Sequence, residues 1–439
     1  MTALITRVDA WEALDSRGNP TVACAVEVAG GQGQAVVPSG ASTGAHEAVE
    51  LRDGGDRYGG KGVLGAVANV QTVLAEAVTG IDANDQHAVD EALRAADPTP
   101  GFGQVGANAV LAVSLAACLA AADAERVPLY RWLAAGSAGA TPLLPLPMVN
   151  ILSGGAHAGG AIDVQDFLVV PVGADTFAQA VEWAWRVRRA AADLMDAAGH
   201  GTALVADEGG LAAPFASNRA ALELLTQAIE RSGLAPGSDA AVAIDVAATQ
   251  LVDGDRYALA SEGRSLGADE WVAELADWCA RFPIVSIEDP LGEDDWRGWA
   301  TATKALGHVQ VLGDDLFVTN TERLARGVEE GIANAVLVKP NQTGTVSGAR
   351  RVVDLAQRSG YATVLSARSG ETEDAWLADM AVGWRTGQIK VGSVMRSERT
   401  AKWNRLLRIE AELDRAGGSD YAGRAALEPA IRLGAPGAP

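Results

Sequence analysis

The sequence has few cysteines and few basic side chains, and both scarcities narrow what the protein can be. Its three cysteines, Cys24, Cys118 and Cys279, lie far apart, each within an apolar run. Such a set argues against a disulfide framework or a cysteine-based metal site, and it favours a reducing, cytoplasmic setting. The chain carries 35 lysines and arginines against 56 aspartates and glutamates, a formal net charge of −21. This excess argues against nucleic acid or an anionic membrane as a partner, so local cations or a metal must hold any anionic substrate.

Long hydrophobic runs are also missing. The longest apolar tract, residues 109–122, is shorter than the roughly 20 residues that span a bilayer. We therefore interpret it as a buried, alanine-rich helix. The first residues include Asp9, Glu12 and Asp15 where a signal peptide would have an apolar stretch. No targeting segment is expected.

The pattern of apolar residues predicts two domains of different architecture. Residues 21–28 and 35–37 have strand character on either side of a glycine-rich turn, which predicts a β-hairpin. Helical patterns follow at about 63–78, 89–95 and 109–122, so residues 1–138 are predicted to form an α+β domain. The segment 134–147 is rich in Ala, Gly, Ser and Pro, as is typical of a domain junction. Strands and helices alternate after it, and residues 139–439 are predicted to form an α/β barrel.

Four apolar runs in this second part each end in a charged residue. The runs are β-branched enough to be strands buried on both faces, and they end at Asp245, Glu288, Asp314 and Lys339. The last three of these residues are 26 and 25 positions apart, which fits one strand, one helix and two loops. Chemistry in such barrels takes place at the carboxyl ends of the strands, so the four side chains are expected to meet there.

One acid after a strand is usually a helix cap or a solvated loop residue. Three acids and a lysine at barrel spacing are better explained as a metal site with a base beside it. Carboxylates gathered at one barrel mouth would raise one another's pKa unless a cation lay among them. The set contains oxygen ligands and no Cys or His, which favours Mg²⁺ over zinc.

Several long strings in this chain resemble the enolase family. They are DSRGNPTV at 15–22, VPSGASTG at 37–44, DEGG at 207–210, SIEDPL at 286–291, GDDLFVTN at 313–320, SGETED at 369–374 and GQIK at 387–390. The resemblance extends over essentially the whole chain. It implies a small α+β domain on a modified (β/α)₈ barrel, and a homodimer.

The resemblance also implies a role for each residue of the predicted metal site. Asp245, Glu288 and Asp314 would bind the catalytic Mg²⁺, and Ser42 would help to bind a second ion that arrives with the substrate. Lys339 would be the base, and crowding by the metal and Lys390 would give it the lowered pKa that a lysine base requires. The reaction implied is α-proton abstraction from 2-phosphoglycerate or a close derivative, with metal-stabilised negative charge as is established for this superfamily.

Further residues are assigned to the substrate by the same resemblance. Lys390 would contact the substrate carboxylate, and Glu208 would be the general acid for the departing hydroxyl. The phosphoryl group would be bound by Arg368, whose planar fork suits phosphate oxygens, and by Ser369. His157 lies in SGGAHAGG at 153–160, which is similar to an enolase active-site loop, so a substrate role is favoured over that of a packed loop histidine.

Two positions depart from the family pattern. Ala367 stands where the family has a histidine near the phosphoryl group, and Asp166 stands where it has a glutamate that assists hydroxide departure. The Asp166 carboxylate is one methylene shorter, and displacement of a catalytic group by about 1 Å can cost on the order of 10²-fold in rate. The pair of changes favours an altered phosphoryl and leaving-group pocket.

Three functions remain open at the level of sequence. The changed pocket suits a phosphorylated or phosphonylated carboxylate, as in an enolase-like carboxyphosphonoenolpyruvate synthase of phosphonate antibiotic pathways. The alternatives are an ordinary glycolytic enolase and, in another class, a non-catalytic enolase-like binding protein. Racemisation or cycloisomerisation of a carboxylate ranks last because Arg368 and Ser369 favour a phosphorylated substrate.

Overall fold

The computed structural model of the chain describes residues 2–40, 44–135 and 141–434. The amino-terminal part begins with an antiparallel sheet in the order β1-β2-β3. Its strands are β1 (Ile5–Leu14), β2 (Pro20–Val28) and β3 (Gly31–Val36). The predicted hairpin is confirmed, because β2 pairs with β3 across a turn in which Gly30 has a φ of 92°. The sequence prediction missed β1, which pairs with β2 along its whole length.

Helical segments follow this sheet in the chain, and several of them pack on it. They are α1 (Leu64–Asn69), the π-turn η2 (Val70–Leu74), α2 (Ala75–Val78), α3 (Gln86–Ala96), α4 (Ala107–Ala124) and α5 (Leu129–Ala135). α4 packs so closely on β3 that a Cβ atom on Gly33 would lie 2.2 Å from the carbonyl oxygen of Ala116. By length and composition α4 could cross a membrane, but 83% of it is buried inside the protein. The α4 segment is therefore a core helix, as its alanine content predicts.

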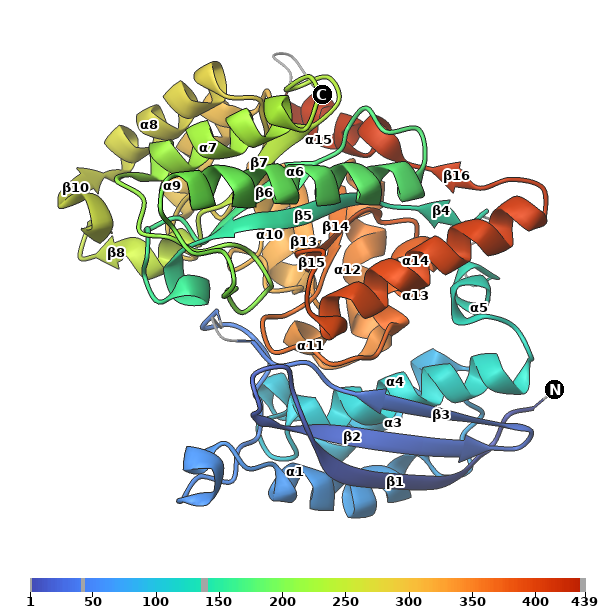
Figure 1. Cartoon of the computed structure of the whole chain (residues 1–439). Coiled ribbons are helices and arrows are strands. Elements are labelled where there is room, and N and C mark those ends of the chain that lie inside the picture. The colour runs from blue at the N-terminus through green and yellow to red at the C-terminus, as the bar shows by residue number, and fades with distance from the viewer. Residues whose placement is uncertain (1, 41–43, 136–140, 435–439) are drawn as a thin grey trace.

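The carboxyl-terminal part is a closed barrel of eight strands in the order β11-β12-β13-β14-β15-β5-β6-β7. Figure 1 shows this part above the amino-terminal sheet. The strands are β5 (Leu146–Ser153), β6 (Asp166–Val170), β7 (Ala241–Asp245), β11 (Ile284–Glu288), β12 (Gln310–Gly313), β13 (Ala335–Val338), β14 (Ala362–Ser366) and β15 (Gly387–Gly392). Most of their residues are buried on both faces, which explains their continuous apolar runs. The predicted barrel is confirmed.

An outer layer of helices surrounds the barrel. The longer ones are α6 (Phe177–Ala197), α7 (Asn218–Arg231), α8 (Ala268–Arg281), α9 (Trp296–Leu306), α10 (Thr321–Glu330), α12 (Val346–Arg358), α13 (Trp376–Gly383) and α14 (Ser397–Arg415). The shorter helices are α11 (Pro340–Thr343) and α15 (Glu428–Gly434). Small strands complete the structure, namely β8 (Val252–Asp253), β9 (Arg256–Leu259) and β10 (Arg264–Gly267) in one sheet, and β4 (Leu143–Leu144) paired with β16 (Asp420–Tyr421).

One strand of the barrel runs against the others. β6 is antiparallel to both of its neighbours, β5 and β7, while the remaining neighbours are parallel. The register pairs Asp166, the first residue of β6, with Asp245, the last residue of β7. The reversal therefore places Asp166 at the barrel mouth, where the other strands end.

The amino-terminal domain reaches the same mouth. Ser39 and Gly370 exchange two backbone hydrogen bonds of 2.8 Å, which tie the chain after β3 to the loop after β14. The predicted domain boundary between residues 138 and 139 falls outside the described residues and stays a prediction.

Candidate active site

Five charged side chains meet at the barrel mouth because each lies at or near the carboxyl end of a strand. Asp245 and Glu288 are the last residues of β7 and β11 and lie opposite each other in the register. Asp314 and Lys339 come directly after β12 and β13. Lys390, in β15, lies beside the end of β14. Four of them are buried and Lys339 is largely buried, with 11% of its side chain exposed, so their charges must be neutralised within the site.

The two lysines provide that neutralisation. Lys390 Nζ lies 2.8 Å from Asp245 Oδ2 and 2.7 Å from Glu288 Oε2. Lys339 Nζ donates a hydrogen bond to Asp314 Oδ2. The predicted acids and lysines are thus in direct contact. Lys390 reaches across the barrel to the carboxylates that end β7 and β11, and Lys339 contacts the carboxylate that follows the neighbouring strand β12.

Opposing effects act on the pKa of Lys339. Burial by itself lowers the pKa of Lys339, but the adjacent Asp314 carboxylate outweighs burial and raises the pKa above its ordinary value in the protein alone. The lowered pKa predicted for Lys339 depends on a metal ion bound nearby, so it stays a prediction. Burial and the nearby Asp245 carboxylate raise the pKa of Glu288 well above its ordinary value. The raised pKa of Glu288 indicates that the two lysines do not fully neutralise the cluster of Asp245, Glu288 and Asp314.

The donor set fits a hard divalent cation. Glu288 Oε1 is buried and has no hydrogen-bond partner among the residues that the structure describes, which is unusual for a buried carboxylate oxygen. The other carboxylates are oriented by amides: Gln165 Nε2 donates to Asp245 Oδ2 at 3.1 Å, and Gln342 Nε2 donates to Asp314 Oδ1 at 3.0 Å. Such supporting hydrogen bonds are typical of metal ligands. Ser42, predicted to bind a second ion, lies outside the described residues.

Asp289 is a further buried acid, which supports the backbone at Asp314 and was not predicted from the sequence. Asp289 Oδ1 and Oδ2 accept hydrogen bonds of 2.9 and 2.8 Å from the backbone N–H groups of Asp314 and Asp315. Asp289, Asp314 and Asp315 each have a carboxylate oxygen within 4.8 Å of the other two. The acid pairs at 288–289 and 314–315 were the available sequence signal.

The predicted phosphoryl end lies next to the carboxylates, around a small cavity of about 20 Å³. Its described lining residues are His157, Gln165, Glu208, Asp245, Lys339, Ser366, Ala367, Arg368, Ser369 and Lys390. This cavity unites the predicted base with the predicted phosphoryl-binding residues. Ala367, where the family has a histidine, lies in the same wall.

Arg368 is held by a residue of the other domain. Its Nη1 lies 2.9 Å from Glu47 Oε2 and 3.0 Å from Asn341 Oδ1, and its Nη2 lies 3.2 Å from Glu47 Oε1. The Glu47 carboxylate shows that an anion placed here can form two hydrogen bonds with the Arg368 guanidinium group. Nothing in the sequence near Glu47 indicated this contact, because the two residues are 321 positions apart.

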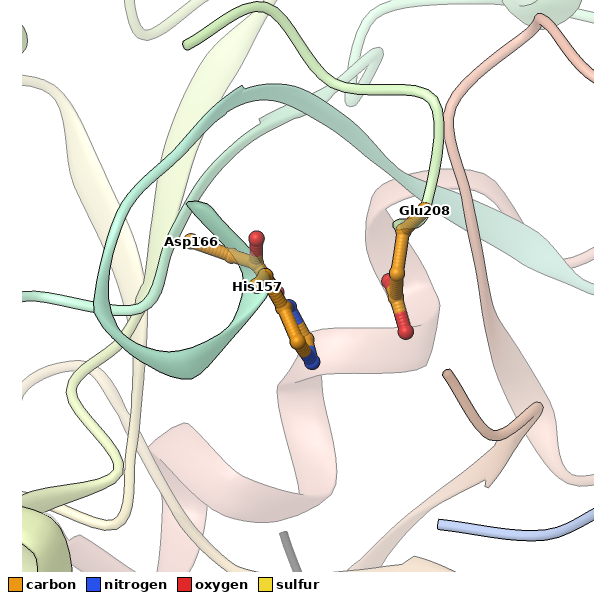
Figure 2. A group of neighbouring side chains, drawn as sticks. All are labelled: His157, Asp166 and Glu208. Atoms are coloured by element: carbon orange, nitrogen blue, oxygen red, sulfur yellow. The ribbon is translucent and has the colours of Figure 1, made fainter. Parts of the chain in front are cut away.

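His157, Asp166 and Glu208 form a third group (Figure 2). They come from the β5–β6 loop, the start of β6 and a later loop, and their ligand atoms lie within 4.8 Å of one another. His157 Nδ1 lies 2.9 Å from Asp166 Oδ2. Burial alone would lower the pKa of His157, but the carboxylates of Asp166 and Glu208 raise it to about 9. Burial raises the pKa of Glu208, but His157 and Arg399 outweigh burial and lower it.

The chain matches two family descriptions along most of its length. Residues 5–133 match the family described as Enolase, N-terminal domain, and residues 141–430 match the one described as Enolase, C-terminal TIM barrel domain. The second match alone exceeds half of the chain and contains the barrel-mouth residues. The chain therefore belongs to the enolase family and is an enzyme of the enolase superfamily.

Proposed function

We propose that this protein abstracts the α-proton of 2-phosphoglycerate, or of a close phosphorylated or phosphonylated derivative, to give an enolpyruvate product. One observation carries the proposal. A single cavity is lined by Lys339, Lys390 and Asp245, and also by Arg368 and Ser369. It offers a base, cations for a carboxylate, and a guanidinium for a phosphoryl group within one small volume.

Asp245, Glu288 and Asp314 would hold Mg²⁺, with Ser42 proposed for a second ion that arrives with the substrate. The buried, unpartnered Glu288 Oε1 and the all-oxygen donor set support this assignment. When bound, Mg²⁺ supplies positive charge that stabilises the second negative charge formed on a carboxylate when its α-proton leaves.

Lys339 is the proposed base. Burial already favours its neutral amine, and Asp314 is the group that opposes deprotonation. Lys390 remains charged, since its two carboxylate neighbours raise its pKa well above the ordinary value against the effect of burial. Its ammonium group is suited to bind the substrate carboxylate and to stabilise the charge that develops there.

The residues proposed to surround the phosphoryl group and the departing hydroxyl favour a substrate other than plain 2-phosphoglycerate. Arg368 and Ser369 are proposed to bind the phosphoryl oxygens, and Glu208 to serve the departing hydroxyl. The lowered pKa of Glu208 makes it a carboxylate in the protein alone, with the cationic His157 as the proton carrier beside it. Ala367 leaves a methyl group where an imidazole is usual, which gives a larger phosphoryl substituent room. We therefore favour a carboxyphosphonoenolpyruvate synthase-like activity over plain dehydration.

Steady-state assay with 2-phosphoglycerate and Mg²⁺ tests this assignment. We expect Mg²⁺-dependent exchange of the α-proton in D₂O, with dehydration slow compared with ordinary enzyme rates. Dehydration at about 10 s⁻¹ or faster would identify an ordinary enolase instead. Absence of both exchange and Mg²⁺-dependent ligand binding by calorimetry would favour a non-catalytic binding protein. The homodimer and the cytoplasmic location are further proposals from the family, and light scattering tests the first of them.

A further inference from the structure

A second cavity, separate from the active-site cavity, lies where the two domains meet. Its volume is about 490 Å³, which is within the range of small-molecule pockets, and it shares no described lining residue with the active-site cavity. Its walls come from the start of α3, from α5, from the start of α12 and from the residue after α13. Figure 1 shows α5 between the two domains. Ligand pockets form preferentially at such domain junctions.

Two tryptophans give this inter-domain cavity an aromatic lining. Trp132 lies on α5 and Trp384 directly follows α13, so the two indole rings come from different domains. Trp384 is only 3% exposed, and Trp132 is partly buried against the hydrophobic core. Indole rings that are held in this way offer a flat apolar surface to a ligand that is itself planar.

Arg350 supplies positive charge to the same cavity. Its Nη2 lies 2.8 Å from Asp354 Oδ1, and Asp354 is the only described acid within ion-pair distance of this guanidinium group. Its Nη1 is buried and has no hydrogen-bond partner among the described residues. The guanidinium carbon lies 6.0 Å from the centre of the Trp384 ring. The free donors of Arg350 are thus available to an anionic group on a ligand that contacts this indole.

Two further lining residues carry unpaired polar atoms. Ser347 Oγ and Gln86 Oε1 are buried and have no hydrogen-bond partner within the described part of the chain. Both residues are held by the buried Asp90, which accepts hydrogen bonds of 2.9 Å from Gln86 Nε2 and 2.7 Å from the backbone N–H of Ser347. Burial raises the pKa of Asp90, which limits the negative charge beside the cavity. Since buried polar atoms are normally paired, a hydroxyl donor and a carbonyl acceptor await partners here.

We propose that the inter-domain cavity binds a small aromatic anion. The ring would contact the two indoles, a carboxylate or phosphate would accept hydrogen bonds from Arg350 and Ser347, and an N–H group would donate to Gln86. The chain has a net charge of −21, so an anion can be held only where a local cation is unpaired, as Arg350 Nη1 is. Aromatic amino acids and nucleotides share this chemistry, because each combines a planar ring, an N–H donor and an acidic group. The proposal does not depend on the reaction at the barrel mouth.

Calorimetry on the full chain tests this site, with L-tryptophan and AMP as separate probes. Saturable binding of L-tryptophan alone would identify an amino acid as the ligand class, and saturable binding of AMP alone would identify a nucleotide. Tryptamine and adenosine keep the rings but lack the acidic groups, so each should bind about tenfold or more weakly than its acidic counterpart. Equal affinities with and without the acidic group would overturn the role of Arg350. If neither acidic probe bound with a Kd below about 1 mM, the proposal would fail.

Arg350→Gln locates the bound probe, and Arg351→Gln is its matched control. Arg351 is the next residue of α12, does not line the cavity and lies 3.9 Å from Glu91. We expect Arg350→Gln to weaken binding of the acidic probe about tenfold or more and Arg351→Gln to leave it unchanged. Equal affinities of the two variants would place the probe elsewhere and overturn the assignment.

Trp132→Leu tests the contact with the ring. It should weaken binding of the acidic probes and of their uncharged or cationic counterparts alike, by about threefold or more, since an aromatic pair is lost. Unchanged affinities would overturn the contact between the ligand and α5. Circular dichroism confirms that each variant is folded.

Discussion

Replacement of Lys390 by methionine tests whether the barrel mouth is a carboxylate cluster that requires a cation. Lys390 Nζ contacts both Asp245 and Glu288, at 2.8 and 2.7 Å, and its side chain is only 7% exposed. Methionine keeps much of the length and the apolar stem but removes the charge. Two buried carboxylates are then left without their shared partner.

The cost can be estimated from the burial of this pair. Removal of one partner from a buried ion pair destabilises a protein by on the order of 3 to 5 kcal/mol. Unfolding entropies near 2 cal/mol/K per residue give about 0.9 kcal/mol/K for a chain of 439 residues. The melting temperature of Lys390→Met in metal-free buffer should therefore fall by roughly 3 to 5 °C relative to the wild type.

Magnesium provides the discriminating measurement. A cation that binds only the folded state stabilises that state. In Lys390→Met, Asp245 and Glu288 have lost their ammonium partner, so Mg²⁺ should bind there more strongly than in the wild type. Differential scanning fluorimetry with EDTA and with saturating Mg²⁺ should show a larger gain for Lys390→Met than for the wild type. Lys304→Met, at an exposed lysine of α9, controls for the substitution itself. Equal melting temperatures for the two variants without metal, or equal gains from Mg²⁺, would refute the reasoning.

Three further predictions follow from the same site. Lys339→Ala should slow exchange of the α-proton of 2-phosphoglycerate in D₂O by about 10² to 10⁴-fold, as expected for loss of a general base. If proton NMR showed that the variant exchanges this proton as fast as the wild type, Lys339 would not be the base. Ala367→His should raise the dehydration rate by on the order of 10²-fold, because the imidazole adds a hydrogen-bond donor that stabilises negative charge in the transition state. An unchanged kcat would show that position 367 does not limit dehydration. His157 gives the pH dependence: its pKa rises from 6.5 unfolded to about 9 folded, so its stabilisation is present below about 6.5 and lost as pH rises to 9. Urea unfolding should show a decline on the order of 3 kcal/mol over that range in the wild type and not in His157→Gln; equal declines would show that another group is responsible.

Much of the barrel could be predicted because its strands are buried on both faces. The runs before Asp245, Glu288 and Lys339 are continuous and apolar, and a parallel barrel brings their carboxyl ends together. β1 was missed because its residues alternate with many polar and exposed positions, so it lacks an apolar run. The contact between Glu47 and Arg368 joins two domains, and no local pattern encodes such a pairing.

The pKa of Lys339 in the protein alone could not be predicted from the sequence because opposing effects act on it. The prediction counted a bound metal and Lys390, two cations that would each lower the pKa. The structure adds a direct hydrogen bond to Asp314, which favours the charged amine more strongly. Sequence reasoning could name the residues at the barrel mouth, but the sign of this shift depends on which carboxylate touches the amine.

The reversed strand β6 explains why the two departures from the family pattern belong to one change. The segment 154–165 between β5 and β6 forms only a short 3₁₀ turn and no crossover helix, and β6 returns antiparallel, with Asp166 at the mouth and His157 in the connecting loop. His157 then lines the same cavity wall as Ala367, which follows β14 from the other side. Substitutions at 166 and 367 therefore act on one space, the first through the orientation of an imidazole and the second by direct contact. Their effects on phosphate binding should be coupled, since residues that share a site depart from additivity by about 0.5 to 3 kcal/mol.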